Sequence, residues 1–296
     1  MKIIDEIKNS FKSGGLLIKL IYINIGIFSL VKLFDILFFF FNQSGSGDFF
    51  LEWLAVPADF SRLIIRPWTL ISYMFLHLGF IHILFNLLWL FSFGKLFLAY
   101  LPEKKLLNIY LLGGISGALL YILCYNIFPI FDSTREISVA FGASASVMAI
   151  VVAVSTYAPN HIVYVPFFGN VKIKYIAIVF IITDLLLIYN KSSNIGGHIA
   201  HLGGAFFGFY YINRLRKGHN ITLKFDKIVD SFLGLFKKRS HLKVKYKKAE
   251  SDMDYNARKA SEQKEIDKIL EKIAKSGYDS LSSEEKEKLF KMSNKK

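Results

Sequence analysis

The sequence has a single cysteine and little charge in its apolar first two thirds. That cysteine, Cys124, excludes an intramolecular disulfide and a cluster of cysteine ligands around a metal. An HExxH motif, the signature of many zinc peptidases, is absent. Of the 37 Lys and Arg residues, 23 lie after residue 213. The remainder of the chain therefore has the low charge density that a lipid environment requires.

Apolar residues make up 53% of the chain and are concentrated in long runs. A helix rises about 1.5 Å per residue, so each run of roughly 20 residues is long enough to cross a hydrocarbon core of about 30 Å. The first run is too long for a signal-peptide core and has no small-residue cleavage site, so we expect it to be retained. The sequence predicts an all-α membrane protein with six spans, over residues 16–41, 71–98, 105–127, 139–157, 172–189 and 196–213.

Positive charges indicate how these spans are oriented. Residues 1–19 carry four Lys and Arg, residues 95–105 carry three and residues 158–174 carry two. The opposite side carries fewer, at Arg62, Arg66, Arg135 and Lys191. By the positive-inside rule we expect both termini in the cytoplasm. We expect the membrane to be the plasma membrane of a bacterium.

The predicted membrane domain covers residues 16–213 and follows a short cytoplasmic segment, residues 1–15. Within it, residues 42–70 mix aromatic residues, proline and both signs of charge. This composition is typical of short helices that lie in the membrane interface rather than across the bilayer.

Two segments follow the membrane domain. Residues 214–248 carry 12 basic and two acidic residues. They form either an amphipathic helix on anionic lipid or the ordinary positive bias next to a span. Residues 249–296 carry 11 residues of each charge and are expected to form a small helical tail, either an appendage or a partner-binding element. Ser282 and Glu285 have the spacing of a capping box at the start of its second helix.

Three groups of polar residues interrupt the spans. The second span begins with His77, His82 and Asn86, the fourth with Ser144 and Ser146, and the sixth with His198 and His201. These spans all begin on the non-cytoplasmic side, so their polar residues share a depth of roughly 6–15 Å at about 1.5 Å per residue. Polar side chains are costly in lipid, so this convergence predicts a functional site.

Small residues predict that the fourth and sixth spans touch. The fourth span opens with alanine and glycine, and Gly204 and Gly208 form a GxxxG pattern one and two turns after His201. Small residues let helix backbones approach closely in lipid. A serine hydroxyl can then reach an imidazole within about 3 Å, as in an activated nucleophile.

Each span offers a second candidate for the site. Ser146 lies about 200° around the helix from Ser144, so it faces another way. His198 is one turn shallower than His201, and the glycines follow the face of His201. We therefore prefer Ser144 and His201.

These segments resemble the rhomboid family of intramembrane serine proteases. The matching motifs are HxxxxHxxxN in the second span, GxS in the fourth, and HxxGxxxG within AHLGG and its continuation in the sixth. The resemblance implies a six-helix rhomboid-like bundle with an interfacial first outer loop, and a serine endopeptidase without a cofactor. Two positions depart from the family. Ala145 stands where glycine is common, and Arg66 precedes Trp68 where many members have a Trp-Arg pair.

The resemblance also implies a role for each polar residue. Ser144 is similar to the nucleophile and His201 to the general base, which later acts as the acid. His82 and Asn86, with the backbone N–H of Ser144, correspond to the oxyanion hole, and His77 to a structural or accessory histidine. The chemistry agrees, because a serine needs a base and an oxyanion needs aimed donors. The sequence places no carboxylate to complete a triad, so we expect a dyad.

Asp184 is an acidic residue within the fifth span, near its outer end. It either orients a histidine, lines a watery cavity, or caps polar groups near the interface, which is the commoner role. Lys32 and Asp35 in the first span are three residues apart and are expected to pair.

Other functions of a membrane protein would require other sequence features. A membrane metalloprotease needs a carboxylate ligand beside its histidines, and none is expected here. A rhomboid-like pseudoprotease lacks the serine or the histidine, and a transporter has broken helices around mid-membrane charges. We expect single-span membrane proteins as substrates and no nucleic-acid partner. The sequence leaves the oligomeric state open.

Overall fold

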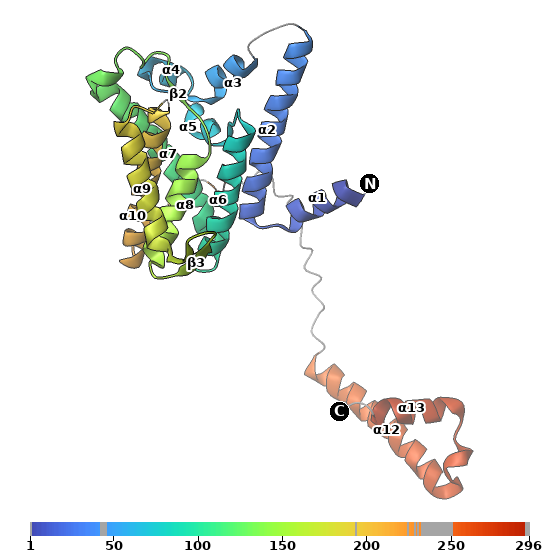
Figure 1. Cartoon of the computed structure of the whole chain (residues 1–296). Helices are drawn as coiled ribbons and strands as arrows, with labels where there is room; N and C mark the ends of the chain where they lie inside the picture. Colours follow the sequence, from blue (N-terminus) through green and yellow to red (C-terminus); the bar gives the residue numbers. More distant parts are fainter. Residues whose placement is uncertain are drawn as a thin grey trace. The chain divides into compact units, whose positions relative to one another are not determined.

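The structure is a computed structural model that describes residues 2–41, 46–192, 194–223, 225–227, 229, 231 and 251–293. It divides into two compact units, residues 1–236 and 237–296, which are described separately (Figure 1).

The first unit is a bundle of helices. After the short α1 (Lys2–Ser13), its long helices are α2 (Leu16–Phe40), α6 (Phe80–Leu98), α7 (Glu103–Ile127), α8 (Ser144–Tyr157), α9 (Ile173–Tyr189) and α10 (Ile195–Arg216). Of these, α2, α6 and α7 are long and apolar enough to cross a membrane by length and composition. Each of the six overlaps a predicted span, and the predicted all-α class is correct. The number of spans remains a prediction.

Two of the six helices begin later than predicted. The second span was expected from residue 71, but the chain there forms α5 (Thr69–Ser72) and η1 (Tyr73–Phe75) before α6 begins. The fourth was expected from residue 139, but β2 (Val139–Ala140) pairs with β1 (Val56–Pro57), and Gly142 has a φ of +118°. A positive φ ends any regular helix, so α8 starts only at Ser144.

The predicted interfacial segment consists of short elements, α3 (Ser46–Leu54), β1, α4 (Phe60–Ile65) and α5. Arg66 holds it together, because its guanidinium pairs with Glu52 at 2.8 Å and lies 4.8 Å from the ring centre of Trp53. Trp68 stacks on Trp53 and donates its indole N–H to the Trp53 carbonyl at 2.9 Å. The reversed Arg-Pro-Trp order thus still gives a cation–π contact and an ion pair. In α2, Lys32 and Asp35 form the expected pair at 2.7 Å.

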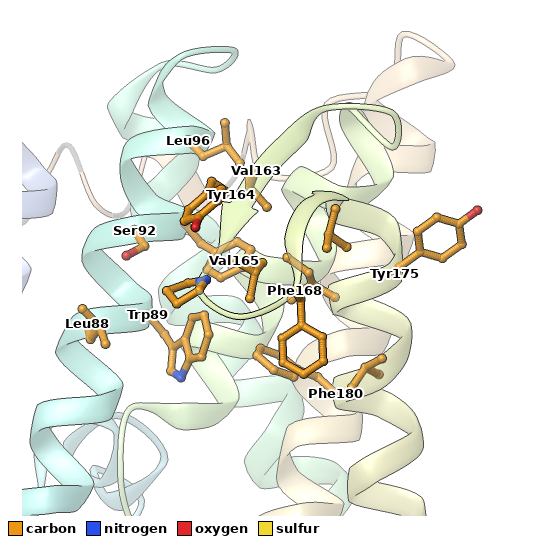
Figure 2. A pocket seen from close by; sticks show the side chains of 15 residues that line it. Leu88, Trp89, Ser92, Leu96, Val163, Tyr164, Val165, Phe168, Tyr175 and Phe180 are labelled. Carbon is orange, nitrogen blue, oxygen red and sulfur yellow. The ribbon is translucent and has the colours of Figure 1, made fainter.

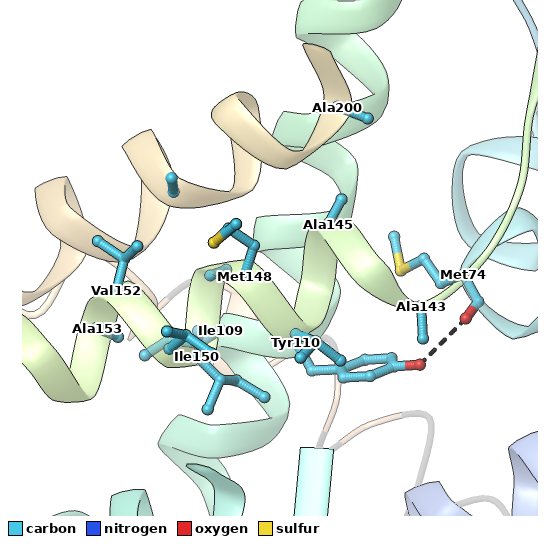
Figure 3. Close-up of a cluster of buried hydrophobic side chains, with 14 of the residues drawn as sticks. Met74, Ile109, Tyr110, Ala143, Ala145, Met148, Ile150, Val152, Ala153 and Ala200 are labelled. Carbon is cyan, nitrogen blue, oxygen red and sulfur yellow. Dashed lines mark hydrogen bonds between the residues drawn. The ribbon is translucent and has the colours of Figure 1, made fainter. Parts of the chain in front are cut away.

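Helix α8 lies at the centre of the bundle and packs against α6, α7, α9 and α10 (Figure 1). Every residue from Ala145 to Ser155 is buried. Figure 3 shows its alanines and valines among side chains from neighbouring helices, and the Tyr110 hydroxyl of α7 bonded to the Met74 carbonyl at 3.2 Å. A helix buried on all sides fixes the position of its first residue, Ser144.

Glycines set the distance between α8 and its neighbours. A Cβ on Gly204 of α10 would lie 2.1 Å from the Ala145 carbonyl oxygen, and one on Gly208 would lie 2.2 Å from the Ala149 carbonyl oxygen. Both distances are far inside van der Waals contact, so the predicted contact of these helices depends on both glycines. From the other side, Gly113 and Gly117 of α7 approach the same two alanines. This second GxxxG pair was not predicted.

The second unit is a pair of helices, α12 (Asp252–Ser276) and α13 (Ser283–Ser293), joined through η3 (Tyr278–Ser280). The predicted capping box is present: Ser282 donates its N–H to Glu285 at 2.7 Å, and Glu285 donates its N–H to the Ser282 hydroxyl at 3.3 Å. The Ser282 N–H and the Lys272 ammonium hold the pKa of Glu285 below its usual value. The predicted amphipathic helix within 214–248 falls mostly outside the described residues.

We expect Gly204→Leu to separate α8 from α10, because the new side chain has no room beside the Ala145 carbonyl. Forced overpacking of this kind typically costs about 1–3 kcal/mol of unfolding free energy. Gly26→Leu in α2 is the matched control, because nothing lies within 4 Å of its Cβ position. Both variants are unfolded by heat in detergent, and unfolding is monitored by the reaction of Cys124 with a thiol dye. Equal midpoints for the two variants would disprove the role of Gly204.

Candidate active site

Four of the predicted polar residues, Asn86, Ser144, His198 and His201, line one cavity of about 260 Å³ between α6, α8, α9 and α10, whereas His77, His82 and Ser146 do not line it. Its polar lining consists of Asn86, Ser144, Thr183, Asp184, His198 and His201. Apolar side chains such as Val147, Met148 and Phe180 form the rest. Three segments that are far apart in the sequence therefore meet at one place, as their common depth predicted.

Ser144 is the first residue of α8, and its side chain lines the cavity. Ser146 is fully buried on another side, where its hydroxyl faces Gly114 of α7. At a helix start the first backbone N–H groups have no partner within the helix. Among the described residues no hydrogen bond occupies the N–H of Ser144. The serine thus combines an accessible hydroxyl with an unused donor and the positive end of a helix.

Two histidines shape the turn before Ser144. His77 is buried, and its Nε2 accepts the N–H of Ala143 at 3.2 Å. The ring of His82 lies directly on Gly142, where an added Cβ would be 2.8 Å from its Cε1 atom and 2.9 Å from Nε2. Gly142 also donates its N–H to the Tyr73 carbonyl at 2.8 Å. His77 therefore binds the backbone of the turn, and His82 lies beside it.

Asn86 is buried one helical turn after His82. Its Nδ2 donates to the His82 carbonyl at 2.9 Å, the usual bond of a polar side chain within a helix. An amide nitrogen has two hydrogens. Because Asn86 also lines the cavity, its second N–H can serve an acceptor there.

Asp184 of α9 contacts both histidines of α10. Its Oδ1 lies 3.0 Å from His201 Nδ1 and 2.8 Å from His198 Nδ1, and only 6% of its side chain is exposed. The expectation that no carboxylate accompanies the serine and histidine is wrong. The argument that a metal site lacks a carboxylate ligand beside its histidines is therefore wrong as well. Asp184 is far from His201 in sequence, so only the packing of α9 on α10 brings them together. Of the roles considered for Asp184, both contact with a histidine and a place in the cavity wall match the structure.

Ser144 and His201 line the same cavity but are not hydrogen bonded to one another in the described part of the chain. Catalytic contacts are often long until substrate binds. The bond to Asp184 favours a proton on His201 Nδ1, because a carboxylate accepts and does not donate. The Nε2 atom of His201 is then left as a proton acceptor.

An apolar groove of about 550 Å³ adjoins this cavity between α6, α9 and the hairpin of β3 (Ile162–Val165) and β4 (Gly169–Lys172) (Figure 2). Trp89 of α6 and Phe180 of α9 line both spaces. Their rings meet edge to face with centres 5.1 Å apart. This aromatic pair separates the polar cavity from the groove.

The chain is similar in sequence to proteins named as rhomboid-like. The chain is 31% identical over 163 residues to RHOMBOID-like protein 12, mitochondrial, of Arabidopsis thaliana, and 28% identical over 171 residues to the presenilin-associated rhomboid-like protein, mitochondrial, of Bos taurus. These matches cover 52% and 55% of this chain but 48% and 41% of the relatives, so the chain spans about half their length.

Two family models match the chain. Residues 250–295 match a family of unknown function, DUF6576, which coincides with the second unit. The Rhomboid domain model matches residues 66–217, which include every residue of the cavity described above. Because that match covers more than half of the 296 residues, this multi-pass membrane protein belongs to the rhomboid family.

Proposed function

We propose that the protein is an intramembrane serine endopeptidase that hydrolyses peptide bonds in or near the transmembrane segments of other proteins. The observation that carries this proposal is the meeting of Ser144, Asn86 and His201, from three helices, in one cavity. Membership of the rhomboid family supports it. An acyl-transfer site needs a nucleophile, a base and oxyanion donors within reach of one reacting atom, and these residues supply all three.

The proposed reaction begins with the Ser144 hydroxyl. His201 Nε2 takes its proton while Oγ attacks the scissile carbonyl carbon, and a tetrahedral intermediate forms. The same proton then passes from His201 to the leaving amine as the C–N bond breaks, which leaves an acyl ester on Ser144. Water, deprotonated by His201, attacks the ester and returns the serine.

Asp184 gives the site a third member in this mechanism. Its carboxylate accepts from His201 Nδ1 at 3.0 Å, which holds the ring and favours the tautomer with a free Nε2. It also stabilises the imidazolium that forms when the ring takes the serine proton. We therefore propose a Ser144–His201–Asp184 triad in place of the predicted dyad.

The oxyanion donors are the N–H of Ser144 and the second amide N–H of Asn86, with His82 beside the turn. The tetrahedral oxyanion carries a full charge in a cavity of low polarity, where fixed donors are worth far more than in water. Gly142 is essential to this arrangement, because only glycine allows the ring of His82 to lie on the turn.

The proposed substrates are single-span membrane proteins that enter between α6 and α9. The groove on that side is apolar and suits a helix within lipid. A helical substrate hides its carbonyls in hydrogen bonds, so it must unwind locally before attack, and Gly or Pro near the cut favours unwinding.

We propose that both termini lie on the cytoplasmic side, by the distribution of Lys and Arg. The named relatives are mitochondrial proteins by their printed names, whereas a bacterial plasma membrane is our proposal for this chain. The basic residues of 214–248 would rest on anionic lipid of the cytoplasmic leaflet.

Ser144→Ala and His201→Ala are expected to reduce cleavage of a single-span reporter by about 10⁴-fold or more, because each removes a group of the acting unit. The purified full chain, reacted with a serine-directed phosphonate, should be labelled on Ser144 and lose the label in both variants. Ser146→Ala is the matched control and should retain label and cleavage. Labelling at Ser146 instead would refute the assignment.

Asp184→Asn is expected to lower kcat by about 10²–10⁴-fold with little change in KM, because the ring of His201 loses its fixed tautomer. The rate of phosphonate labelling should fall in parallel, since it depends on the same base. If Asp184 only caps polar groups near the helix end, the Asp184→Asn variant should be labelled at the wild-type rate. That result would favour a Ser144–His201 dyad over the triad.

Trp89→Ala is expected to speed cleavage of a transmembrane reporter by about 2- to 10-fold, because an aromatic pair is worth roughly 0.5–1.5 kcal/mol. The rate of labelling by a small water-soluble phosphonate should not rise, since it bypasses the groove. Phe180→Ala should match Trp89→Ala, and Phe91→Ala, at an exposed aromatic of the same helix, should have no effect. An equal acceleration of both reactions would argue against the proposal that substrates reach the cavity past Trp89 and Phe180.

A further inference from the structure

The contacts of Asp184 exceed what a catalytic triad requires. A triad uses one imidazole and one carboxylate oxygen. Here a second imidazole, His198, also points its Nδ1 at Asp184 Oδ1, at 2.8 Å. The other carboxylate oxygen, Oδ2, is buried and has no hydrogen-bond partner in the described part of the chain. A buried carboxylate oxygen without a partner is costly, so it points to a ligand that the triad does not provide.

The three side chains have the chemistry of a zinc site. One carboxylate oxygen and one imidazole nitrogen from each histidine lie within 4.8 Å of one another. Two histidines and one carboxylate are a common ligand set for zinc, which then keeps a fourth position open. Tetrahedral ligands at about 2.0–2.1 Å from the ion lie roughly 3.3 Å apart. The two distances from Asp184 Oδ1 to the imidazole nitrogens, 2.8 and 3.0 Å, would need to widen by only a few tenths of an ångström.

The site is also built of fixed parts. His198 and His201 are three residues apart on one face of α10, and Asp184 comes from the neighbouring α9. The exposed fractions of the three side chains are 12%, 19% and 6%, so the ligands are sheltered but open to the cavity. The open fourth position would face the cavity and hold water.

We propose that Asp184, His198 and His201 bind a zinc ion that reversibly inhibits the protein. The inhibitory part rests on the proposed serine mechanism. Zinc on His201 Nδ1 requires that nitrogen to be unprotonated, so the proton of the neutral ring moves to Nε2. Nε2 is the atom that must accept the Ser144 proton. The metal therefore converts the general base into a donor, and it also takes Asp184 away from its positioning role.

Metal binding is tested without proteolysis. Full-length Ser144→Ala protein in detergent, stripped with a chelator, is titrated with Co²⁺ as a spectroscopic substitute for Zn²⁺. We expect the strong visible bands of four-coordinate cobalt, which Zn²⁺ then displaces. His198→Gln should bind at least about ten-fold more weakly, and His219→Gln, at an exposed histidine, should bind as Ser144→Ala does. Each histidine change is made in the Ser144→Ala background. Absence of bands, or bands unchanged by His198→Gln, would overturn the site.

Inhibition is tested on the active protein. Cleavage is measured with added Zn²⁺ and again after chelation, and each variant is compared with its own chelated rate. We expect wild type and His219→Gln to be inhibited at low Zn²⁺ and restored by chelator, and His198→Gln to need at least about ten-fold more Zn²⁺. Loss of cleavage on chelation would overturn the inhibitory role. Normal cobalt binding by a protein that never cleaves would refute the proposed function and leave the metal site standing.

Discussion

The close approach of α8 and α10 is the constraint on which the rest of the site depends. In lipid no hydrophobic force drives helices together, so their contact relies on close van der Waals packing. At Gly204 there is not even room for a Cβ beside the Ala145 carbonyl oxygen, one residue after Ser144. His201 lies one turn earlier on α10. The same contact that holds the bundle therefore sets the distance between the serine and the imidazole.

The position of Ser144 follows from a second constraint, the turn before α8. Gly142 has a positive φ, its N–H is bound by Tyr73, and the next N–H, of Ala143, is bound by His77. These bonds use the backbone donors of the turn and leave that of Ser144 unused. The two histidines of the second span thus contribute to the site largely through the backbone that they hold.

The sequence was most informative where one helix repeats a small or polar residue on one face. Gly204 and Gly208 predicted the helix contact, and the three polar groups predicted the cavity, because both signals are local and periodic. It was least informative for Asp184, whose partners lie on another helix and whose value depends on how two helices rotate against each other. The late starts of α6 and α8 were not predicted for a related reason. The residues before each helix are also apolar, so composition does not reveal that they form turns and short elements that pair with distant segments.

Asp184 also explains why two histidines precede the glycines of α10. A carboxylate buried beneath lipid needs donors, and a single neutral imidazole supplies one N–H. His198, one turn before His201 on the same helix, supplies a second N–H, so both donors to Oδ1 come from α10. Oδ2 is buried and has no hydrogen-bond partner in the part of the chain that the structure describes. This unpartnered oxygen, on a carboxylate that contacts two imidazoles, is the observation from which the proposed metal site is argued.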